Sequence, residues 1–537
     1  PRIPLPRDLY GESRRNSRGL NLQDPDTLLA LGEDMAKALA APRHAAPLVS
    51  GRRIERGTAR AVRDPAMHAR IVGHVRDIDC AALDAALDAA RRAQPGWDAT
   101  PADARAAILE GAAALFERHT AELMALCVRE AGKTIPDSLA EVREAVDFLR
   151  YYALRARTDF SRPLALPGPT GESNELWLHG RGVFLAISPW NFPLAIFTGQ
   201  VCAALAAGNS VLAKPAEATT LIAARAVALL HEAGIPPDVL HFTPGSGSRI
   251  GARAIPDPRV AGVVFTGSTE VAQTINRGLA AREGAIPVLI AETGGQNAML
   301  VDSSALPEQV VLDVVQSAFD SAGQRCSALR VLCLQEDIAP RVLELLAGRM
   351  DELAVGDPGL LCTDIGPVID AKSLEALNAH TRTMETQGRL IARARIASGL
   401  DGCFFPPMAV EIDRIDVLER EVFGPILHVV RWKAHELDRM IEAINRTGYG
   451  LTLGVHSRIE SVQRHVAQTA RVGNVYVNRN MIGAVVGVQP FGGQGLSGTG
   501  PKAGGPHYLH RFATERTVTV NTAAVGGNTG LLSLNDD

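Results

Sequence analysis

The feature that most constrains the fold is a series of five short apolar segments between Gly182 and Gly295, separated by helix-like segments. The apolar segments are GVFLAIS, SVLAKP, VLHFTPG, VAGVVFTGS and PVLIAETGG. The residues between them, 194–207, 220–233, 248–255 and 269–282, have apolar side chains at helical spacing. Strands that alternate with helices form βαβ units with a parallel sheet. The sequence therefore predicts a doubly wound α/β domain of the size that binds a dinucleotide.

The same alternation starts again after Gly295 and predicts a second α/β domain. It contains the strand-like segment AMLVD, a helix over 307–321 and the strand-like segment ALRVLCLQ. Before Gly182, strand-like residues 51–77 are followed by four alanine-rich amphipathic helices, predicted over 81–94, 101–119, 120–130 and 137–153. Residues 1–47 are interpreted as a linker or lead-in. The late segment ERTVTVNTAAV is predicted to be an exposed strand that pairs with another chain.

Composition and charge argue against several classes of protein. A formal charge of −4 over 537 residues indicates no basic surface for nucleic acid or an anionic membrane. The sequence contains no apolar run near the roughly 20 residues that span a bilayer. Seven cysteines without CxxC or Cys/His spacing favour reduced thiols, a cytoplasmic location and no metal site. The first residue, Pro1, suggests a piece of a longer chain or a processed product.

The stretch SAGQRCSAL contains a candidate nucleophile, Cys326. Arg325 precedes it, and a cation together with backbone N–H groups favours the reactive thiolate. The alternative is that Cys326 is a buried residue that behaves as a small hydrophobe. On this stretch alone the packing role is favoured, so the assignment of Cys326 as a nucleophile depends on the rest of the chain.

Chemically informative residues follow the predicted strands, in the turns SPWNF, KPAE, PGSGSRIG, FTGS and AETGG. Ligands of open parallel sheets bind beyond these carboxyl ends. FTGST could present backbone N–H groups to a pyrophosphate, or could be a plain helix N-cap. Lys214 and Glu217 of KPAE could hold the two hydroxyls of an adenosine ribose, or could be a surface ion pair. GSGSRIG has the spacing GxGxxxG and fails the strict dinucleotide fingerprint.

Glu292 closes the apolar strand PVLIAE and is a candidate general base. Desolvation at such a position raises the pKa of a carboxyl group towards the range that a general base requires. The alternative is a helix-capping or surface carboxylate. Glu292 and Cys326 are separated by a predicted strand and a long helix, which leaves room for one to return near the other.

About eight ordered motifs resemble those of the aldehyde dehydrogenase superfamily over roughly residues 50–515. They are FLAISPWNFP, LAKPAE, VVFTGSTEV, IAETGGQNA, GQRCSA, EREVFGPIL, YGLTLGV and PFGGQGLSGTG. Five further stretches resemble the L-glutamate-γ-semialdehyde (Δ1-pyrroline-5-carboxylate) dehydrogenase domain of bifunctional bacterial proline utilization A proteins. These are PRDLYG, RRNSRG, NRNMIGAVVGVQPFGG, SGTGPKAGGPHYL and GGNTGLLSL.

The resemblance implies an α/β fold with three parts. These are a Rossmann-type NAD-binding domain over 48–157 and 181–293, an α/β catalytic domain over 294–506, and a small β oligomerisation flap. The flap and C-terminal tail are assigned to 158–180 and 507–537, and residues 1–47 remain the lead-in.

The resemblance also assigns the catalytic roles. Cys326 attacks the aldehyde, and the Asn191 side chain with the Cys326 backbone N–H holds the resulting oxyanion. Hydride transfer to the nicotinamide leaves a thioester, and Glu292 activates the water that hydrolyses it. The cofactor implied is NAD, because the carboxylate of Glu217 would repel a 2′-phosphate. The residues implied to bind NAD are Ile187, Ser188, Pro189, Trp190, Lys214, Glu217, Gly247, Thr266, Gly267, Ser268, Gly294, Glu421 and Phe423.

Substrate choice is implied by a second group of residues. Ser327 and Gly483–Ala484 match the serine and loop that hold the α-carboxylate of a semialdehyde. Phe192 and Phe491 match residues that pack against its aliphatic chain. Arg325 and Glu144 complete the set. Without the resemblance, Ser327 and its loop would be ordinary small-residue packing, and Glu144 a solvated surface charge.

The implied function is NAD+-dependent oxidation of L-glutamate γ-semialdehyde to L-glutamate. One alternative is a dehydrogenase of another ω-semialdehyde, such as succinate semialdehyde. The other is a catalytically silent scaffold or dimerisation module, against which the intact Cys326, Glu292, Asn191, Lys214 and Glu421 argue. The partners implied are a second copy of the chain, as a homodimer or higher oligomer, and an FAD-dependent proline dehydrogenase domain in a longer chain.

Overall fold

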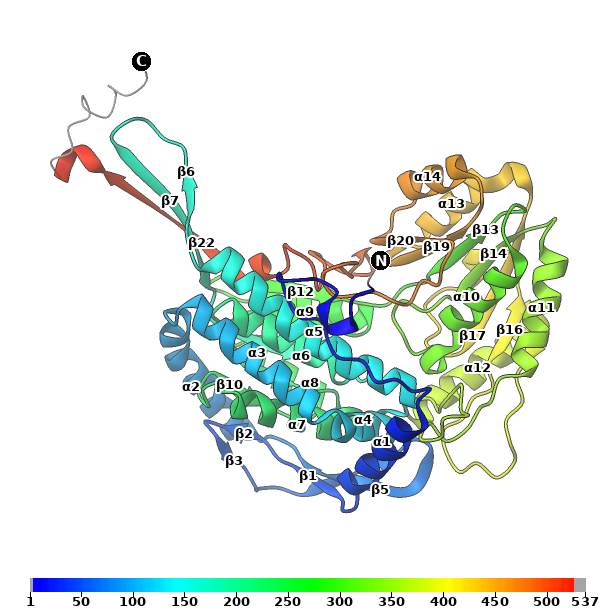
Figure 1. Ribbon diagram of the computed structural model, residues 1–537, viewed down its shortest axis with the longest axis horizontal. Coiled ribbons are helices and arrows are strands. Elements are labelled where there is room, and N and C mark those ends of the chain that lie inside the picture. Colours follow the sequence, from blue (N-terminus) through cyan, green and yellow to red (C-terminus); the bar gives the residue numbers. More distant parts are fainter. Residues whose placement is uncertain (1–2, 526–537) are drawn as a thin grey trace.

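A computed structural model describes residues 3–525 and contains two large sheets with an arm that projects from one of them (Figure 1). The first sheet has the order β12–β11–β8–β9–β10–β2–β3. Its strands are β2 (Leu48–Val49), β3 (Arg52–Arg53), β8 (Val183–Ile187), β9 (Ser210–Lys214), β10 (Leu240–Phe242), β11 (Val260–Thr266) and β12 (Val288–Glu292). Strands β8 to β12 are mutually parallel and are the five predicted from the sequence.

The order of these parallel strands creates a switch point. In chain order β8 to β12 lie as 3-2-1-4-5, so the chain reverses direction across the sheet between β8 and β11. Ligands of such sheets bind in the crevice beyond the carboxyl ends at this point. The turn after Ile187 and the turn after Thr266 flank it.

Helices cover both faces of the first sheet. They are α2 (Cys80–Asp98), α3 (Ala102–Arg118), α4 (Thr120–Ala131), α5 (Ile135–Phe160), α6 (Ala195–Ala206), α7 (Thr220–Glu232), α8 (Gly247–Ala254) and α9 (Thr269–Ala280). Helix α6 is apolar on all sides and almost wholly buried, because it lies between the sheet and the helices α3 and α5. Helix α5 is longer than the predicted 137–153, since Thr134 caps its first turn and Pro136 occupies the start.

The second sheet is also mainly parallel and has the order β15–β16–β17–β14–β13–β19–β20. Its strands are β13 (Ala298–Val301), β14 (Val331–Gln335), β15 (Arg389–Arg393), β16 (Met408–Glu411), β17 (Ile426–Trp432), β19 (Thr452–His456) and β20 (Asn474–Val477). Its helices are α10 (Pro307–Phe319), α11 (Ala339–Asp351), α12 (Ala371–Gln387), α13 (Leu437–Arg446) and α14 (Glu460–Thr469). The predicted α/β class is therefore confirmed, and the domain boundaries stay a prediction.

The arm is a three-stranded antiparallel sheet of β6 (Leu164–Leu166), β7 (Glu172–Gly180) and β22 (Ala513–Asn521). Strand β22 pairs with β7 over nine residues, from Ala513 opposite Gly180 to Asn521 opposite Glu172. The late strand predicted over 515–525 thus starts earlier and pairs within its own chain. Leu164, Val518 and Val520 are exposed on the arm. Residues 526–537, which include the predicted tail, lie outside the described part.

The lead-in is an ordered strip that runs along α5 (Figure 1). The Ser17 backbone N–H and hydroxyl donate to the two carboxylate oxygens of the buried Asp147, at 2.7 and 2.8 Å. Arg14 Nη2 donates to the Val486 carbonyl at 2.6 Å. Helix α1 (Pro25–Ala38) and the small sheet of β1 (Arg43–Ala45), β4 (Ala59–Asp64) and β5 (Met67–Arg76) follow.

Helix α10 differs from its prediction in a way that matters for the site. The sequence predicts a helix over 307–321, but α10 ends at Phe319. Ser321, Ala322 and Gly323 all have positive φ, at 54°, 54° and 65°. Left-handed backbone is uncommon outside glycine and ends a helix. The chain therefore turns sharply three residues before Cys326.

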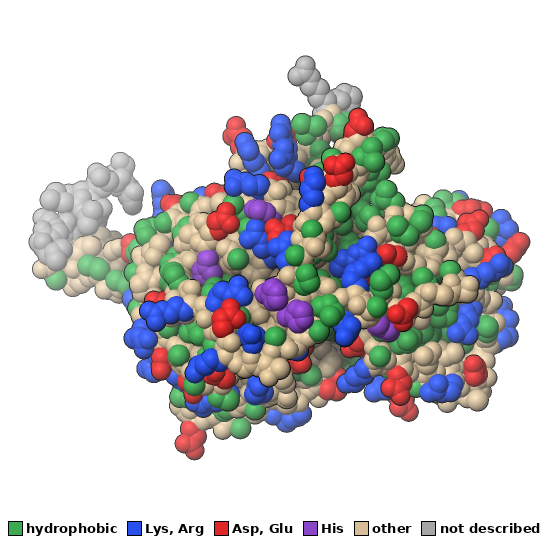
Figure 2. Space-filling view, turned by 90° about the horizontal axis from the view of Figure 1, so that it is seen from below, with side chains coloured by type: hydrophobic (Ala, Val, Ile, Leu, Met, Phe, Trp, Pro, Cys, Tyr) green, Lys and Arg blue, Asp and Glu red, His purple; other side chains and the backbone are tan. Residues whose placement is uncertain are grey.

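Over residues 3–525, none of the helices is both long enough and apolar enough to cross a membrane. On the face seen in Figure 2, Lys and Arg side chains are interspersed with Asp and Glu rather than gathered in one patch. Within the same described range, no cluster of three or more His, Cys, Asp or Glu could hold a metal ion.

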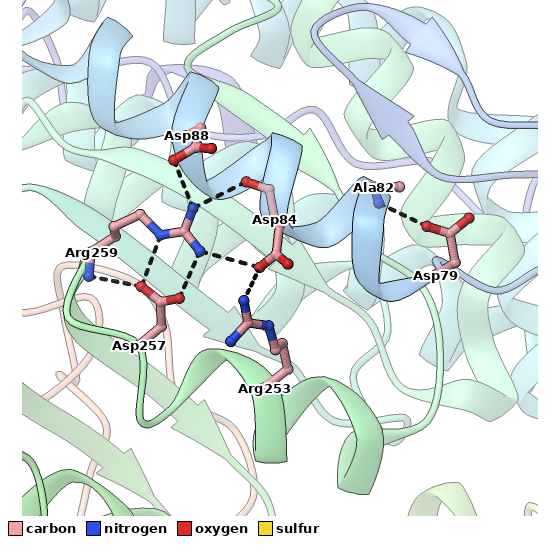
Figure 3. A network of polar contacts seen from close by, with 7 residues as sticks. All are labelled: Asp79, Ala82, Asp84, Asp88, Arg253, Asp257 and Arg259. Carbon is pink, nitrogen blue, oxygen red and sulfur yellow. Dashed lines mark hydrogen bonds and ion pairs between the residues drawn. The ribbon is translucent and has the colours of Figure 1, made fainter.

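A polar network ties α2 to the start of β11 (Figure 3). Arg259 holds Asp257 in a two-pronged contact, with Nε–Oδ1 at 2.9 Å and Nη2–Oδ2 at 2.7 Å. Its third nitrogen donates to Asp88 at 2.7 Å, and Arg253 donates to Asp84 at 2.6 Å. The Arg259 side chain is only 15% exposed, whereas that of Arg253 is 45% exposed.

We expect Arg259→Met to lower the free energy of unfolding by about 1.5–3 kcal/mol, because hydrogen bonds to charged groups contribute about that much. The measurement is the urea midpoint followed by circular dichroism. Arg253→Met is the matched control, and its exposed side chain should leave the midpoint close to that of the original protein. Equal shifts for both variants would contradict the assigned role of Arg259.

Candidate active site

A cavity of about 430 Å³ lies beside the carboxyl ends of β11 and β12 and brings most of the predicted reacting and substrate-binding residues together. Its wall includes Glu144, Phe192, Thr266, Glu292, Arg325, Cys326, Ser327, Gly483, Ala484 and Phe491. These residues come from α5, from the strand ends of the first sheet, from the turn after α10 and from residues 482–491. Segments far apart in the sequence therefore meet at one cavity.

Arg330 organises the loop that carries Cys326. Its side chain is 2% exposed, and its Nη1 donates to the Gly323 carbonyl at 2.7 Å and to the Gly424 carbonyl at 3.1 Å. Its Nη2 donates to the Arg325 carbonyl and to Glu421 Oε1, both at 3.0 Å. One buried guanidinium thus joins two carbonyl groups of the nucleophile loop to the segment that contains Glu421 and Gly424.

Two amide side chains hold the backbone around Cys326. Asn297 Nδ2 donates to the Cys326 carbonyl at 2.6 Å. Asn191, which is 8% exposed, donates from Nδ2 to the Gln324 carbonyl at 3.0 Å. Asn191 is therefore aimed at the loop that carries the thiol, two residues before it. An amide in this place can reach an oxygen that develops on a carbon bonded to sulfur.

Cys326 carries a neutral thiol rather than a thiolate. Burial raises its pKa to about 12, and the nearby carboxylates Glu421 and Glu292 act in the same direction. The sequence suggested that Arg325 would favour the thiolate, and this interpretation is wrong for the structure described. Arg325 Nη2 donates to Asp137 at 2.6 Å, and the cation that opposes the rise at Cys326 is Arg330.

Glu292 lies at the end of β12, is 9% exposed and faces the cavity. Its Oε2 accepts a hydrogen bond from the Gly493 N–H at 3.3 Å, and its Oε1 has no protein partner. Burial raises the pKa of this carboxyl well above its usual range, as the apolar strand predicted. A carboxyl group of this kind can accept a proton from water when it is ionised.

The predicted ribose ligands lie outside this cavity, at the end of β9. Lys214 is 5% exposed, and Glu217 lies in the short helix Glu217–Thr219. Glu217 Oε1 accepts a hydrogen bond from the Gly247 N–H at 3.1 Å. A Cβ on Gly247 would lie 3.7 Å from Lys214 Nζ, so the glycine leaves space beside the ammonium. An ammonium, a carboxylate and an open glycine suit the ribose of a dinucleotide.

The other predicted cofactor residues line the switch point. Ile187 ends β8, Thr266 ends β11, and Ser268 caps α9 by accepting from the Val271 N–H at 3.3 Å. Gln200 of α6, which the sequence did not single out, bridges the two turns. It accepts from the Ser188 hydroxyl at 2.7 Å and donates to Thr266 Oγ1 at 2.8 Å.

The remaining cofactor residues are placed as follows. Pro189 and Trp190 lie in the turn after β8, Gly267 in the turn after β11, and Gly294 after β12. Trp190 and Phe423 meet edge to face, with ring centroids 5.5 Å apart. Burial raises the pKa of Glu421, and the charge of Arg330 opposes that rise. Apart from Glu421 and Phe423, the residues predicted to bind the cofactor thus lie at or just beyond the carboxyl ends of strands of the first sheet, and their role in binding NAD stays a prediction.

A buried ion pair lies next to Phe192, which lines the cavity. Lys133 pairs with Glu141 at 3.2 Å, with side chains 5% and 1% exposed. Lys133 Nζ also lies 4.1 Å from the centroid of the Phe192 ring. Glu144 was interpreted from periodicity as a solvated charge, but burial and the charge of Glu141 raise its pKa to about 8. Glu144 therefore faces the cavity as a carboxyl group that titrates near neutral pH.

Sequence reasoning missed part of the cavity wall. Leu9, Tyr10 and Asn16 of the lead-in line it, as do Asp137 and Asp147 of α5. No local pattern marks the lead-in as part of a site, because its position depends on contacts such as that of Ser17 with Asp147. Asp137 had a weak signal, since a carboxylate in the first turn of a helix is common for other reasons.

The fold and this arrangement define the class of protein. A family model described as "Aldehyde dehydrogenase family" matches residues 54–518, and the chain belongs to that family. Among solved structures, a variant 1-pyrroline-5-carboxylate dehydrogenase from Thermus thermophilus is 34% identical with a TM-score of 0.90. The similarity covers 94% of this chain and 99% of that one.

Longer proteins are more similar in sequence. The "Bifunctional protein PutA" of Klebsiella aerogenes is 54% identical over 525 residues, which are 96% of this chain and 39% of the relative. A variant proline utilization A from Bradyrhizobium japonicum is 55% identical with a TM-score of 0.89, covering 98% of this chain and 50% of that one. The chain thus spans well under two thirds of these relatives. A 1-pyrroline-5-carboxylate dehydrogenase of Geobacillus sp. (strain WCH70) is 36% identical over 85% of this chain and 89% of that protein.

The raised pKa of Cys326 predicts slow alkylation. Without nucleotide, the rate of reaction with iodoacetamide should rise about tenfold for each pH unit between pH 7 and 9, because only the thiolate reacts. Mass spectrometry of the separate peptides gives this rate. The exposed Cys80 and Cys362 serve as internal references and should react faster at pH 7. Faster alkylation of Cys326 than of both references at pH 7 would contradict the neutral thiol.

Proposed function

We propose that this chain oxidises L-glutamate γ-semialdehyde to L-glutamate with NAD+ as the oxidant. The observation that carries the proposal is the single cavity in which Cys326 and Glu292 lie together with Ser327 and the Gly483–Ala484 loop. The first pair suits acyl-thioester chemistry, and the second suits a carboxylate at the other end of a short substrate. The names of the Geobacillus and Thermus relatives support this substrate.

The chemistry of this chain's residues begins at the thiol. Cys326 Sγ adds to the aldehyde carbon and loses its proton, while Asn191 Nδ2 and the Cys326 N–H donate to the oxygen that becomes negative. Asn191 already lies beside this loop, bound to the Gln324 carbonyl. When bound, the nicotinamide supplies the acceptor for the hydride that leaves the former aldehyde carbon. Glu421, fixed by Arg330, is placed to hold the nicotinamide ribose.

Glu292 is the proposed general base for hydrolysis of the thioester. Its free Oε1 takes a proton from a water molecule as the water oxygen attacks the thioester carbon. The C–S bond then breaks and returns the thiol. The balance is one aldehyde, one NAD+ and one water consumed, and one carboxylate, one NADH and two protons released. The raised pKa of Glu292 means that this step speeds up as the pH rises, because only the ionised carboxyl accepts the proton.

Substrate selection is proposed to depend on the carboxylate-binding end. Ser327 is 4% exposed and borders the cavity beside the nucleophile, and Gly483 presents backbone without a side chain. Phe192 and Phe491 provide apolar contact for the chain between the two reactive ends. The alternative of another ω-semialdehyde keeps the same catalytic residues, and a silent scaffold would not need them.

The wider context belongs to the same proposal. We propose a cytoplasmic enzyme that forms a homodimer or higher oligomer through the arm, since Val518 and Val520 are exposed on it. The similarity to bifunctional relatives supports an FAD-dependent proline dehydrogenase domain elsewhere in a longer chain.

We expect Ser327→Ala to lower kcat/KM for L-glutamate γ-semialdehyde by about 10- to 100-fold, because one hydrogen bond to a charged group contributes about 1.5–3 kcal/mol. Pentanal, which lacks a carboxylate, should lose less than about threefold. NADH absorbance with each substrate gives both values. Cys326→Ala should abolish turnover of both. Equal losses for the two substrates in Ser327→Ala would argue against the carboxylate role.

A second prediction concerns the substrate itself. Purified protein should oxidise L-glutamate γ-semialdehyde with a higher kcat/KM than succinate semialdehyde or propanal, because only the first offers an α-carboxylate at the distance of Ser327. Steady-state kinetics on this panel decide the matter. Efficient oxidation of propanal with no NADH from the glutamate semialdehyde would overturn the proposed substrate.

A further inference from the structure

Asp77 lies next to the turn that leads to Gly247, whose N–H donates to the proposed ribose ligand Glu217. It follows β5, and the neighbouring Ile78 N–H donates to the Pro244 carbonyl at 2.8 Å. A Cβ on Gly245 would lie 3.4 Å from the Asp77 Cβ and 3.2 Å from an Arg249 nitrogen. Asp77 and Arg249 therefore both pack against this turn.

Asp77 engages two arginines with its two carboxylate oxygens. Arg60 Nε donates to Oδ1 at 3.3 Å, and Arg249 Nη2 lies 3.7 Å from Oδ2. Arg60 Nη2 also donates to Thr220 Oγ1 at 2.9 Å, which fixes that guanidinium at the start of α7. The side chains of Asp77, Arg60 and Arg249 are 29%, 33% and 48% exposed, so a ligand can reach them.

Two of these three residues, Asp77 and Arg60, act electrostatically on Lys214. Burial lowers the pKa of Lys214, the charges of Glu217 and Asp77 raise it, and the charge of Arg60 lowers it. The subsite thus contains three cations (Lys214, Arg60 and Arg249) and two carboxylates (Glu217 and Asp77). The formal net charge of these five side chains is +1, and without the charge of Asp77 it would be +2.

We propose that Asp77 is a specificity-determining residue that keeps Arg60 and Arg249 from accepting a 2′-phosphate, so that a dinucleotide with a free ribose diol is preferred. A phosphate carries about −1.5 to −2 charges, and free guanidinium groups bind it strongly. Asp77 opposes this binding in two ways, because it occupies both guanidiniums and repels the phosphate directly. This inference rests on the proposed function only in taking a nicotinamide dinucleotide as the cofactor.

The test is Asp77→Asn, which keeps the size of the side chain and removes its charge. We expect the ratio of kcat/KM with NADP+ to kcat/KM with NAD+ to rise at least about tenfold. The gain should shrink as salt is raised, because a partly exposed phosphate–guanidinium attraction is screened.

A binding measurement without turnover accompanies the kinetics. Isothermal titration should show adenosine 2′,5′-bisphosphate bound at least about tenfold more tightly by Asp77→Asn than by the original protein, with AMP unchanged. Adding Arg60→Gln and Arg249→Gln to Asp77→Asn should remove most of the gain, because the guanidiniums are the groups released.

Asp88→Asn is the matched control, since it removes the same charge from α2 at a side chain that contacts Arg259 (Figure 3). It should leave the NADP+/NAD+ ratio unchanged. If Asp77→Asn fails to fold, Asp77→Ser provides the same loss of charge. A folded, neutral Asp77 variant with an unchanged ratio and unchanged bisphosphate affinity overturns the inference. Failure of the original protein to bind NAD+ at all instead overturns the proposed function.

Discussion

The interaction on which the site depends is the buried guanidinium of Arg330. Burying a cation is costly unless its N–H groups find acceptors. The two terminal nitrogens of Arg330 find the Gly323 and Arg325 carbonyls of the nucleophile loop, the Gly424 carbonyl and Glu421, while its Nε is buried without a protein partner. The same group therefore closes the left-handed turn after α10 and fixes a carboxylate that the cofactor is proposed to meet. A chain that lost this cation would leave the Glu421 carboxylate without its cation and the Gly323 carbonyl without its donor, whereas the Arg325 and Gly424 carbonyls would still accept from the Ala328 and Ile426 N–H groups.

Burial sets the ionisation of the reacting groups. Cys326, Glu292 and Glu421 each have a pKa raised chiefly by desolvation, and the two carboxylates add to the rise at the thiol. The cation close to the thiol comes from Arg330, because Arg325 is bound to Asp137 on α5. Reactivity at Cys326 is consequently a property of the assembled cavity and not of its neighbours in sequence.

Periodic patterns were enough to predict the parallel strands of the first sheet and most helices, because helices packed on both faces of a parallel sheet impose strict spacing on apolar residues. The strand-end residues could also be predicted, since the carboxyl ends of parallel strands share one edge of the sheet. Three features could not be predicted from the sequence. Ser321 and Ala322 adopt left-handed backbone without being glycine, so α10 ended earlier than expected. The polar neighbours of Arg325 and the place of Glu144 depend on how α5 packs against the loop, which no local pattern encodes.

The lead-in forms part of the cavity in which the reacting groups lie. The matched family region starts at residue 54, yet Leu9, Tyr10 and Asn16 form part of the wall around the reacting groups. The catalytic residues thus lie within the matched family region, whereas part of the cavity wall comes from the lead-in before it. The lead-in is held to α5 through Asp147. Substitutions in the lead-in can therefore change the shape of the cavity without changing the catalytic residues. Relatives with the same catalytic residues and a different lead-in would share a reaction while differing in what they admit to it.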